Sequence, residues 1–213
     1  MKHQTIVLYT GKRDRSIKMG KKIDTEMIEK SISNILIALG EDVNREGIYE
    51  TPKRVAKMYQ EMFEGMQYSN HEIAEMFRKT FSSEERVENT QTHLIIERDI
   101  TLFSFCEHHM ALMYDMKVTV AYIPKNRIIG LSKIIRIVQM VGKRLQLQER
   151  IGNDIADIIH EITGAEDIAV LIKGKHSCVT ARGIKDPNAV TKTSVLRGKF
   201  MKEPLLQQQL YSN

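Results

Sequence analysis

The chain has no run of about 18 apolar residues, the length that a helix needs to cross a membrane. Near its start it has only a short apolar stretch, from Ile6 to Tyr9, whereas a secretory signal has an apolar core of about 7–15 residues and a small-residue cleavage site. Apolar residues make up 42% of the 213 residues and charged residues 28%, as in ordinary soluble domains. We therefore expect a globular protein of the cytoplasm without a membrane partner.

Cysteine is scarce, since the chain has only Cys106 and Cys178, far apart in sequence. In a reducing cytoplasm a structural disulfide is disfavoured, which favours metal binding or catalysis as their role. A redox disulfide between the two stays open as an alternative.

Charge of one sign is not in large excess, because the chain has 32 Lys and Arg residues and 27 Asp and Glu residues, for a formal charge of +5. Aromatic residues make up 6%. This balance favours anionic small ligands and speaks against a dedicated nucleic-acid binder. Basic residues are densest between Lys12 and Lys22, where no aromatic residue could stack on bases. We expect residues 1–22 to be a flexible basic leader.

Three helices are expected after this leader. Apolar residues recur at three- and four-residue steps over 24–40 and 51–65, the second opening with an N-cap threonine and Pro52. A short polar helix follows over 71–79. Together they form a predicted N-terminal helical region, 23–90.

Strand patterns come next. The segments 94–96, 117–123 and 127–129 read as strands, the last two joined by a Pro-Lys-Asn turn. Two closing strands are expected over 168–172 and 191–200.

Between these strand groups lies a helical pattern from Ser132 to Thr163. It is longer than most globular helices, so we expect Ser132 to cap the first of two helices that break near 145–148. The order ββ–αα–ββ predicts an α+β domain over 91–203, followed by a tail, 204–213.

The clearest chemical signal is the segment CEHH, in which Cys106 and His109 have the spacing C-x-x-H. Cys178 lies in a second short segment, HSC. Two thiols and an imidazole fit a tetrahedral zinc ion with an open fourth position. Water bound at such a position has its pKa lowered to about 7, which is typical of catalytic zinc.

Two further histidines, His108 and His176, flank these candidate ligands. Either could be a fourth ligand and make the zinc site structural. Two spare imidazoles are nevertheless more than a structural site needs, and histidine carries protons near neutral pH. This arrangement favours hydrolysis.

Several cations predict a phosphate site. Lys133 and Arg136 lie one turn apart at the start of a helix, where free N–H groups and the helix dipole attract anions, and Arg182 closely follows Cys178. Arg54 and Lys57 share one side of an earlier helix, although solvated surface charge explains them equally well.

Gln148 and Glu149 stand at the expected helix break. A carboxylate there could accept hydrogen bonds from a guanine edge, and a helix-capping role is the alternative.

Six segments in this order resemble the GTP cyclohydrolase I family over roughly residues 45–200. They are ETPKRVAKMY (50–59), ERDITLFSFCEHH (97–109), VAYIPK (120–125), IGLSKIIRIV (129–138), LQLQER (145–150) and HSCVTARGI (176–184).

The resemblance implies a role for each candidate residue. It implies zinc ligation by Cys106, His109 and Cys178, and acid–base catalysis by His108 and His176. It further implies substrate contacts by Ser132, Lys133, Arg136 and Arg182, guanine recognition by Gln148 and Glu149, and phosphate contacts by Arg54 and Lys57 of a neighbouring subunit.

The resemblance also implies the tunnelling fold and a homodecamer of two pentamers. The implied reaction hydrolyses GTP at C8, releases formate and forms 7,8-dihydroneopterin triphosphate, the first step of folate or pterin biosynthesis. Ser132 would assist the rearrangement.

Some features depart from the family pattern. Ser177 is smaller than the residue expected beside Cys178, which predicts looser packing there, and the turn over 110–116 is about one residue longer than expected. The basic leader has no counterpart. Three rival interpretations remain: a binding module with structural zinc, a hydrolase of another purine or pterin, and a thiol–disulfide protein.

Overall fold

The computed structural model describes residues 22–82, 93–125 and 127–211. The predicted leader therefore lies outside the described residues, except for Lys22. Within the described part, no helix is both long and apolar enough to span a bilayer.

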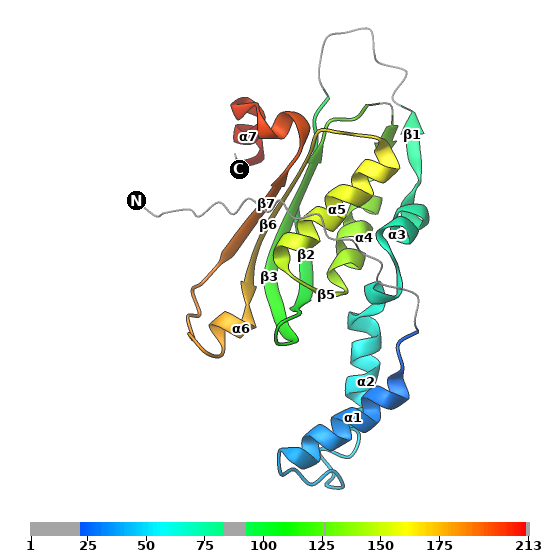
Figure 1. The fold of residues 1–213 in the computed structure, drawn as a ribbon, viewed down its shortest axis with the longest axis vertical. Helices are drawn as coiled ribbons and strands as arrows, with labels where there is room; N and C mark the ends of the chain where they lie inside the picture. Colours follow the sequence, from blue (N-terminus) through cyan, green and yellow to red (C-terminus); the bar gives the residue numbers. More distant parts are fainter. Residues whose placement is uncertain (1–21, 83–92, 126, 212–213) are drawn as a thin grey trace.

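The N-terminal part is helical, as predicted. Asp24 caps the first helix by accepting a hydrogen bond from the Met27 backbone N–H at 2.9 Å. Thr51 is not the N-cap of the second helix but its first helical residue; the N-cap position is Glu50, whose side chain makes no capping hydrogen bond. The first two helices pack together and extend away from the sheet (Figure 1). The bounds are α1 Thr25–Ala38, α2 Thr51–Met62, η1 Glu64–Gln67 and α3 Asn70–Phe77.

A five-stranded sheet forms the centre of the molecule, with the order β5-β2-β3-β6-β7. All neighbours are antiparallel except β5, which runs parallel to β2. The mixed α+β class is thus confirmed. The bounds are β2 Ile95–Cys106, β3 Ala111–Tyr122, β5 Leu145–Gln146, β6 Ile168–His176 and β7 Thr191–Leu196.

The first two strands of this sheet are much longer than predicted. The expected long turn over 110–116 is wrong, because β3 begins at Ala111. The reason is irregular pairing: the register shifts within both strands, and Asp99 and Asp115 have positive φ. Each irregularity interrupts the alternation of apolar and polar residues on which strand prediction depends.

The predicted strand over 127–129 exists as β4 (Arg127–Ile129), but it does not pair with β3. It pairs with β1 (Thr80–Ser82) in a separate two-stranded sheet. The Tyr122 hydroxyl accepts a hydrogen bond from the Ile129 backbone N–H at 3.1 Å and so links this small sheet to the end of β3.

The two expected central helices are α4 (Leu131–Gly142) and α5 (Gln148–Thr163), separated by the predicted break. Ser132 does not cap α4. The chain is extended at Gly130, which is the N-cap, so that Ser132 already lies in the first turn. Both helices cover one face of the sheet (Figure 1), and their isoleucines and valines form the main core with β2, β3 and β6. Ile73 and Ala74 of α3 belong to the same core.

Among the described residues, the second face of the sheet is covered at one end only. A smaller cluster there contains Ala121, Ala169, Phe200 and Leu210. It is formed with η3 (Gly198–Met201) and α7 (Pro204–Tyr211), so the predicted last strand ends early at Leu196 and the predicted tail contains a helix.

Candidate metal centre and its surroundings

Three ligand atoms come together at one edge of the sheet. One atom each of Cys106, His176 and Cys178 lie within 4.8 Å of one another. Cys106 ends β2 and His176 ends β6, while Cys178 follows in the short helix α6 (Ser177–Thr180). Because β3 is antiparallel to both β2 and β6, the last residues of these two strands reach the same edge.

The two histidines of the CEHH segment are not part of this group. His108 and His109 are exposed in the turn between β2 and β3. The described group therefore contains His176 in the position that sequence reasoning gave to His109. Ligation by His109 and proton transfer by His108 and His176 stay predictions.

A buried glutamine holds His176. His176 Nε2 lies 2.8 Å from Gln148 Oε1, while Gln148 Nε2 donates to the carbonyl oxygens of Ile172 at 3.2 Å and Thr191 at 3.3 Å. Carbonyl oxygens only accept, so this contact fixes the amide orientation and makes Oε1 the acceptor from His176. We infer that Nε2 of His176 carries the proton and that Nδ1 has a free lone pair in the neutral ring.

The surroundings also favour the neutral ring. Burial lowers the pKa of His176, and the nearby Glu149 opposes this shift only in part. Gly174 allows the close approach, since a Cβ atom there would lie 2.8 Å from Met116 Cγ and 3.5 Å from Gln148 Oε1.

The pKa of the Cys178 thiol is also shifted by its surroundings. Burial raises the pKa of the Cys178 thiol, and its neighbour Cys106 raises it further, while Arg182 acts in the opposite direction. Two adjacent thiols resist double ionisation unless a cation lies between them. This donor set suits a soft or borderline divalent metal.

The turn that carries His108 and His109 is clamped to α5. The two terminal nitrogens of the Arg150 guanidinium group donate to the carboxylate of Glu107, Nη2 at 3.2 Å from Oε1. The Glu107 backbone N–H also donates to the Gln146 carbonyl at 3.2 Å. The bidentate pair fixes the residue between Cys106 and His108.

Ser177 is similarly anchored, because its hydroxyl donates to the Leu112 carbonyl at 2.7 Å. The small side chain thus ties α6 to β3.

The predicted substrate residues divide into two sets. Glu149 and Arg182 act electrostatically on the metal group, and Gln148 contacts it directly. No contact among the described residues joins the other set to the group. These are Ser132, Lys133 and Arg136 in α4, and Arg54 and Lys57 in α2, where Arg54 pairs with Glu50.

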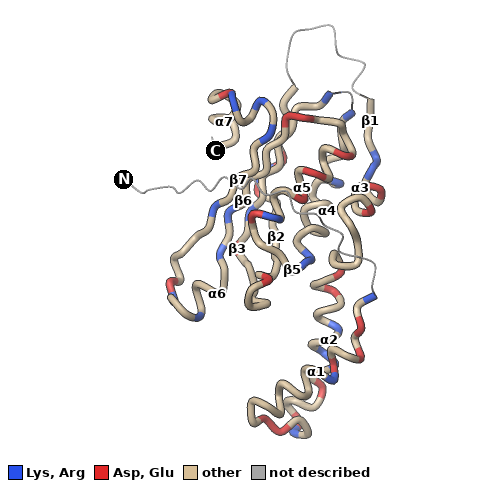
Figure 2. Tube along the Cα trace, viewed as in Figure 1, with Lys and Arg blue, Asp and Glu red and all other residues tan. Residues whose placement is uncertain are grey.

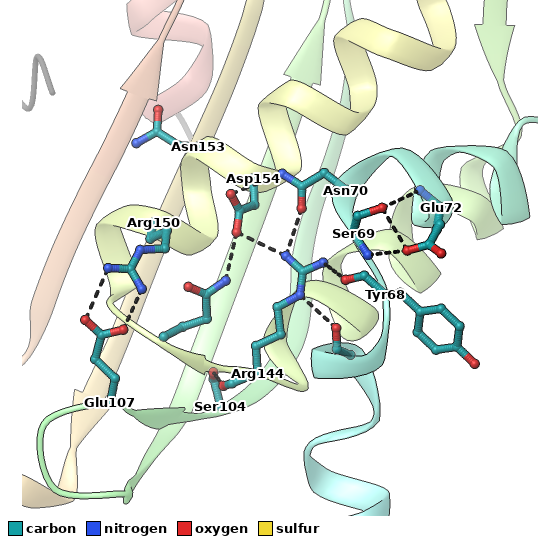
Figure 3. Close-up of polar contacts among 12 residues, drawn as sticks. Tyr68, Ser69, Asn70, Glu72, Ser104, Glu107, Arg144, Arg150, Asn153 and Asp154 are labelled. Atoms are coloured by element: carbon teal, nitrogen blue, oxygen red, sulfur yellow. Dashed lines mark hydrogen bonds and ion pairs between the residues drawn. The ribbon is translucent and has the colours of Figure 1, made fainter. Parts of the chain in front are cut away.

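Sequence reasoning missed a buried polar network beside this edge (Figure 3). Arg144 contacts Asp154 Oδ2 at 3.2 Å and Asn70 Oδ1 at 2.8 Å, and it donates to the backbone carbonyls of Gly65 and Tyr68. Gln146 donates to the same Asp154 oxygen at 2.8 Å. Gln146 is the partner of Cys106 in the pairing of β5 with β2, so the network borders the candidate metal centre.

Fold and site together define an α+β protein with a candidate Cys/His/Cys metal centre at a sheet edge. A sequence model described as GTP cyclohydrolase I matches residues 28–213, and the chain belongs to this family of hydrolases.

Relatives named GTP cyclohydrolase 1 support this assignment. The chain is 56% identical to one from Clostridium beijerinckii, over 90% of this chain and 97% of the relative. It is 58% identical to one from Clostridium acetobutylicum, over 88% and 96%. A solved structure of an archaeosine synthase QueF-Like in the apo form aligns with a TM-score of 0.40 and 15% identity, over 52% of this chain and 97% of that one.

Proposed function

We propose that this chain hydrolyses GTP at C8, releases that carbon as formate and forms 7,8-dihydroneopterin triphosphate. The proposal rests on the cluster of Cys106, His176 and Cys178 at one sheet edge, inside the region that the family model matches. Curated relatives with the same enzyme name at 56–58% identity support it.

We assign zinc as the metal, because thiolate and imidazole are donors that it prefers and the thiols of Cys106 and Cys178 lie together. A bound zinc ion would supply water with its pKa lowered to about 7. Cys106 and Cys178 would hold it together with His109, which follows Cys106 by three residues in the sequence.

His108 and His176 then have separate tasks. His108, exposed on the turn, is proposed to protonate N7 of the purine and so make C8 more electrophilic. His176, oriented by Gln148, is proposed to donate a proton to the ribose ring oxygen. The ring must hold a second proton for this step. Burial lowers the pKa of His176 and so opposes the charged form, while the Glu149 carboxylate offsets part of this effect. Ser132 is proposed to assist the rearrangement.

The substrate is anchored at both ends in this proposal. Glu149 would accept hydrogen bonds from guanine, and Arg182, Lys133 and Arg136 would bind the triphosphate. Gln148 is buried and its amide nitrogen is used inside the protein, so its clearest contribution is to orient His176. Binding energy from the unreacting triphosphate would hold the base in place for chemistry at C8.

The proposed assembly is the tunnelling-fold decamer, two rings of five subunits. Arg54 and Lys57 lie on α2, which leads away from the sheet (Figure 1). Their contribution to a phosphate site is therefore assigned to a neighbouring subunit.

The test is to incubate the full chain with GTP, oxidise the products, and measure neopterin phosphate fluorescence and formate. We expect both products with zinc and neither after chelation. His176→Ala should retain zinc and lose about 10²–10⁴-fold in kcat, whereas the control His93→Ala, an exposed histidine outside the site, should match the parent. No product from zinc-loaded protein would refute the proposal, and loss of zinc in His176→Ala would make His176 a ligand.

A further inference from the structure

Three lysines form a straight line across the second face of the sheet. Lys117 of β3 lies directly opposite Lys173 of β6, which in turn lies opposite Lys192 of β7. All three side chains are exposed. Basic segments of these strands lie side by side in Figure 2. We call Lys117, Lys173 and Lys192 the lysine row.

The row faces away from the candidate metal centre. Along β6, Leu171 packs into the cluster on the second face and Ile172 into the main core, so Lys173 shares the face of Leu171. On β7, Thr193 accepts a hydrogen bond from Gln148 on the helix-covered face, which places Lys192 on the second face. The row is thus separate from Gln148 and His176.

None of the three lysines forms an ion pair with an acid that the structure describes. Lys117 donates to the Thr101 hydroxyl at 2.9 Å, and Thr101 is its partner on β2. The acids of these two strands nearest in sequence, Asp99 and Asp115, stand at strand irregularities with positive φ and pair with no row lysine. Like charges directly opposite each other destabilise a sheet, so an unneutralised row costs stability.

A ligand that neutralises the row must carry several negative charges in a line. Strands lie about 4.8 Å apart, so the row spans roughly 10 Å. A single carboxylate can neutralise only one lysine, whereas a chain of phosphates presents charges along its length. Ammonium groups on flexible stems bind phosphate oxygens as point charges without demanding one geometry. Lys175, two residues along β6 from Lys173, adds a fourth positive charge beside the row.

We propose that the lysine row binds an oligophosphate, either inorganic or carried by a nucleoside triphosphate. This site is distinct from the triphosphate site of the proposed function and does not depend on it. Occupancy would relieve the repulsion among the three lysines and so stabilise the sheet.

The test compares the full chain with Lys173→Gln, which removes the middle charge, and with Lys30→Gln, an exposed lysine of α1, as the matched control. Tripolyphosphate is titrated at low salt by calorimetry, and thermal unfolding is followed with and without it. Without anion, Lys173→Gln should unfold at a higher temperature than the parent because repulsion is removed. Tripolyphosphate should raise the unfolding temperature of the parent more than that of the variant. The affinity of Lys173→Gln for tripolyphosphate at this site should be about fivefold or more below that of the parent. Lys30→Gln should behave as the parent.

GTP turnover and a second ligand separate the outcomes. Lys173→Gln should keep parental turnover, so a failure of the row and a failure of the proposed enzyme reaction are distinguishable. Equal affinity of the row for tripolyphosphate and ATP would identify the phosphate chain as the recognised part, and preference for tripolyphosphate would identify the inorganic anion. Identical titrations and unfolding shifts for the parent and Lys173→Gln would overturn the proposal.

Discussion

Two polar clusters meet at the short strand β5, and they differ in how their polar atoms are satisfied. In the network around Arg144, four contacts to the guanidinium group come from Asp154, Asn70 and two backbone carbonyls, and the network is almost fully buried. In the group around Cys106, the two thiols and a ring nitrogen of His176 lie within 4.8 Å of one another, and the side-chain hydrogen bond of Cys178 is to Cys106. The first cluster is completed by the protein, whereas the second has donor atoms to spare.

This difference separates a structural role from a chemical one. A buried charge must be paired and hydrogen-bonded, so the Arg144 network is what folding requires once that arginine is enclosed. Spare soft ligands at a half-exposed edge contribute little to the fold and suit a metal that binds afterwards. We expect substitutions in the two clusters to have opposite profiles, one affecting stability and the other affecting metal and turnover.

The largest effect is expected for Cys178→Ser. Loss of one thiolate ligand should abolish stoichiometric zinc binding and bring GTP turnover to the background level. Cys178 is half-exposed, so the metal-free variant should unfold within about 0.5 kcal/mol of the metal-free parent. Zinc content by atomic absorption and urea unfolding in the presence of chelator measure both quantities. Full retention of zinc would exclude Cys178 as a ligand.

The opposite profile is expected for Arg144→Met. This change leaves the buried Asp154 carboxylate without its cationic partner, and breaking a buried pair costs about 3–5 kcal/mol. Urea unfolding of the metal-free protein measures the loss. The double variant Arg144→Met/Asp154→Leu should recover part of it, because no unpaired charge remains. A loss below about 1 kcal/mol would contradict the assignment of this network as structural.

A smaller, intermediate effect is expected for Glu107→Gln, which weakens the clamp between α5 and the turn that carries His108 and His109. Zinc content should be unchanged while kcat falls about 10–100-fold, because residues that orient ligands typically contribute this much. Arg150→Met should give the same loss, and the two changes together should cost little more than either alone. Glu29→Gln, on the exposed side of α1, is the control. Additive losses would show that the two residues act independently.

Much of this arrangement could be predicted from local patterns. The helices α1 to α5, the break before Gln148 and the α+β class followed from apolar periodicity and turn residues, whereas α6 and α7 were not predicted. The strand lengths did not, because the bulges near Asp99 and Asp115 interrupt the period-two pattern. The pairing of β4 with β1 depends on contacts between distant segments, which a local pattern does not contain.

The candidate site divides in the same way. The scarcity of cysteine and the histidines beside both cysteines brought attention to Cys106 and Cys178, which do lie together. The burial of Gln148 and its contact with His176 were not predictable, since they require β6, β7 and α5 to converge. The Arg144 network was missed because its members are separated by up to 84 residues in sequence, as in the contact from Asn70 Nδ2 to Asp154.

The smallest effect is expected at the solvent-exposed border of the Arg144 network, where α3 begins. Glu72 accepts hydrogen bonds from the backbone N–H and hydroxyl of Ser69, which lower the pKa of the Glu72 carboxyl, the backbone bond first (Figure 3). The pKa of Glu72 in the folded state lies below its unfolded value of about 4.3. At a pH between these two values the unfolded state therefore binds more protons than the folded state. The stabilisation is therefore present above the unfolded pKa and is lost as the pH falls through the folded pKa.

Glu72→Gln should consequently lower the unfolding temperature slightly at pH 7, and the difference from the parent should shrink as the pH falls below about 4. Thermal unfolding between pH 7 and pH 3 in the presence of chelator measures this, with Glu26→Gln in the first turn of α1 as the control. A difference that stays constant over this range would mean that the cap acts without the charge of the carboxylate. A difference comparable to that of Arg144→Met would mean that exposed and buried members of the network matter equally, which would remove the distinction between a completed buried cluster and its solvated border.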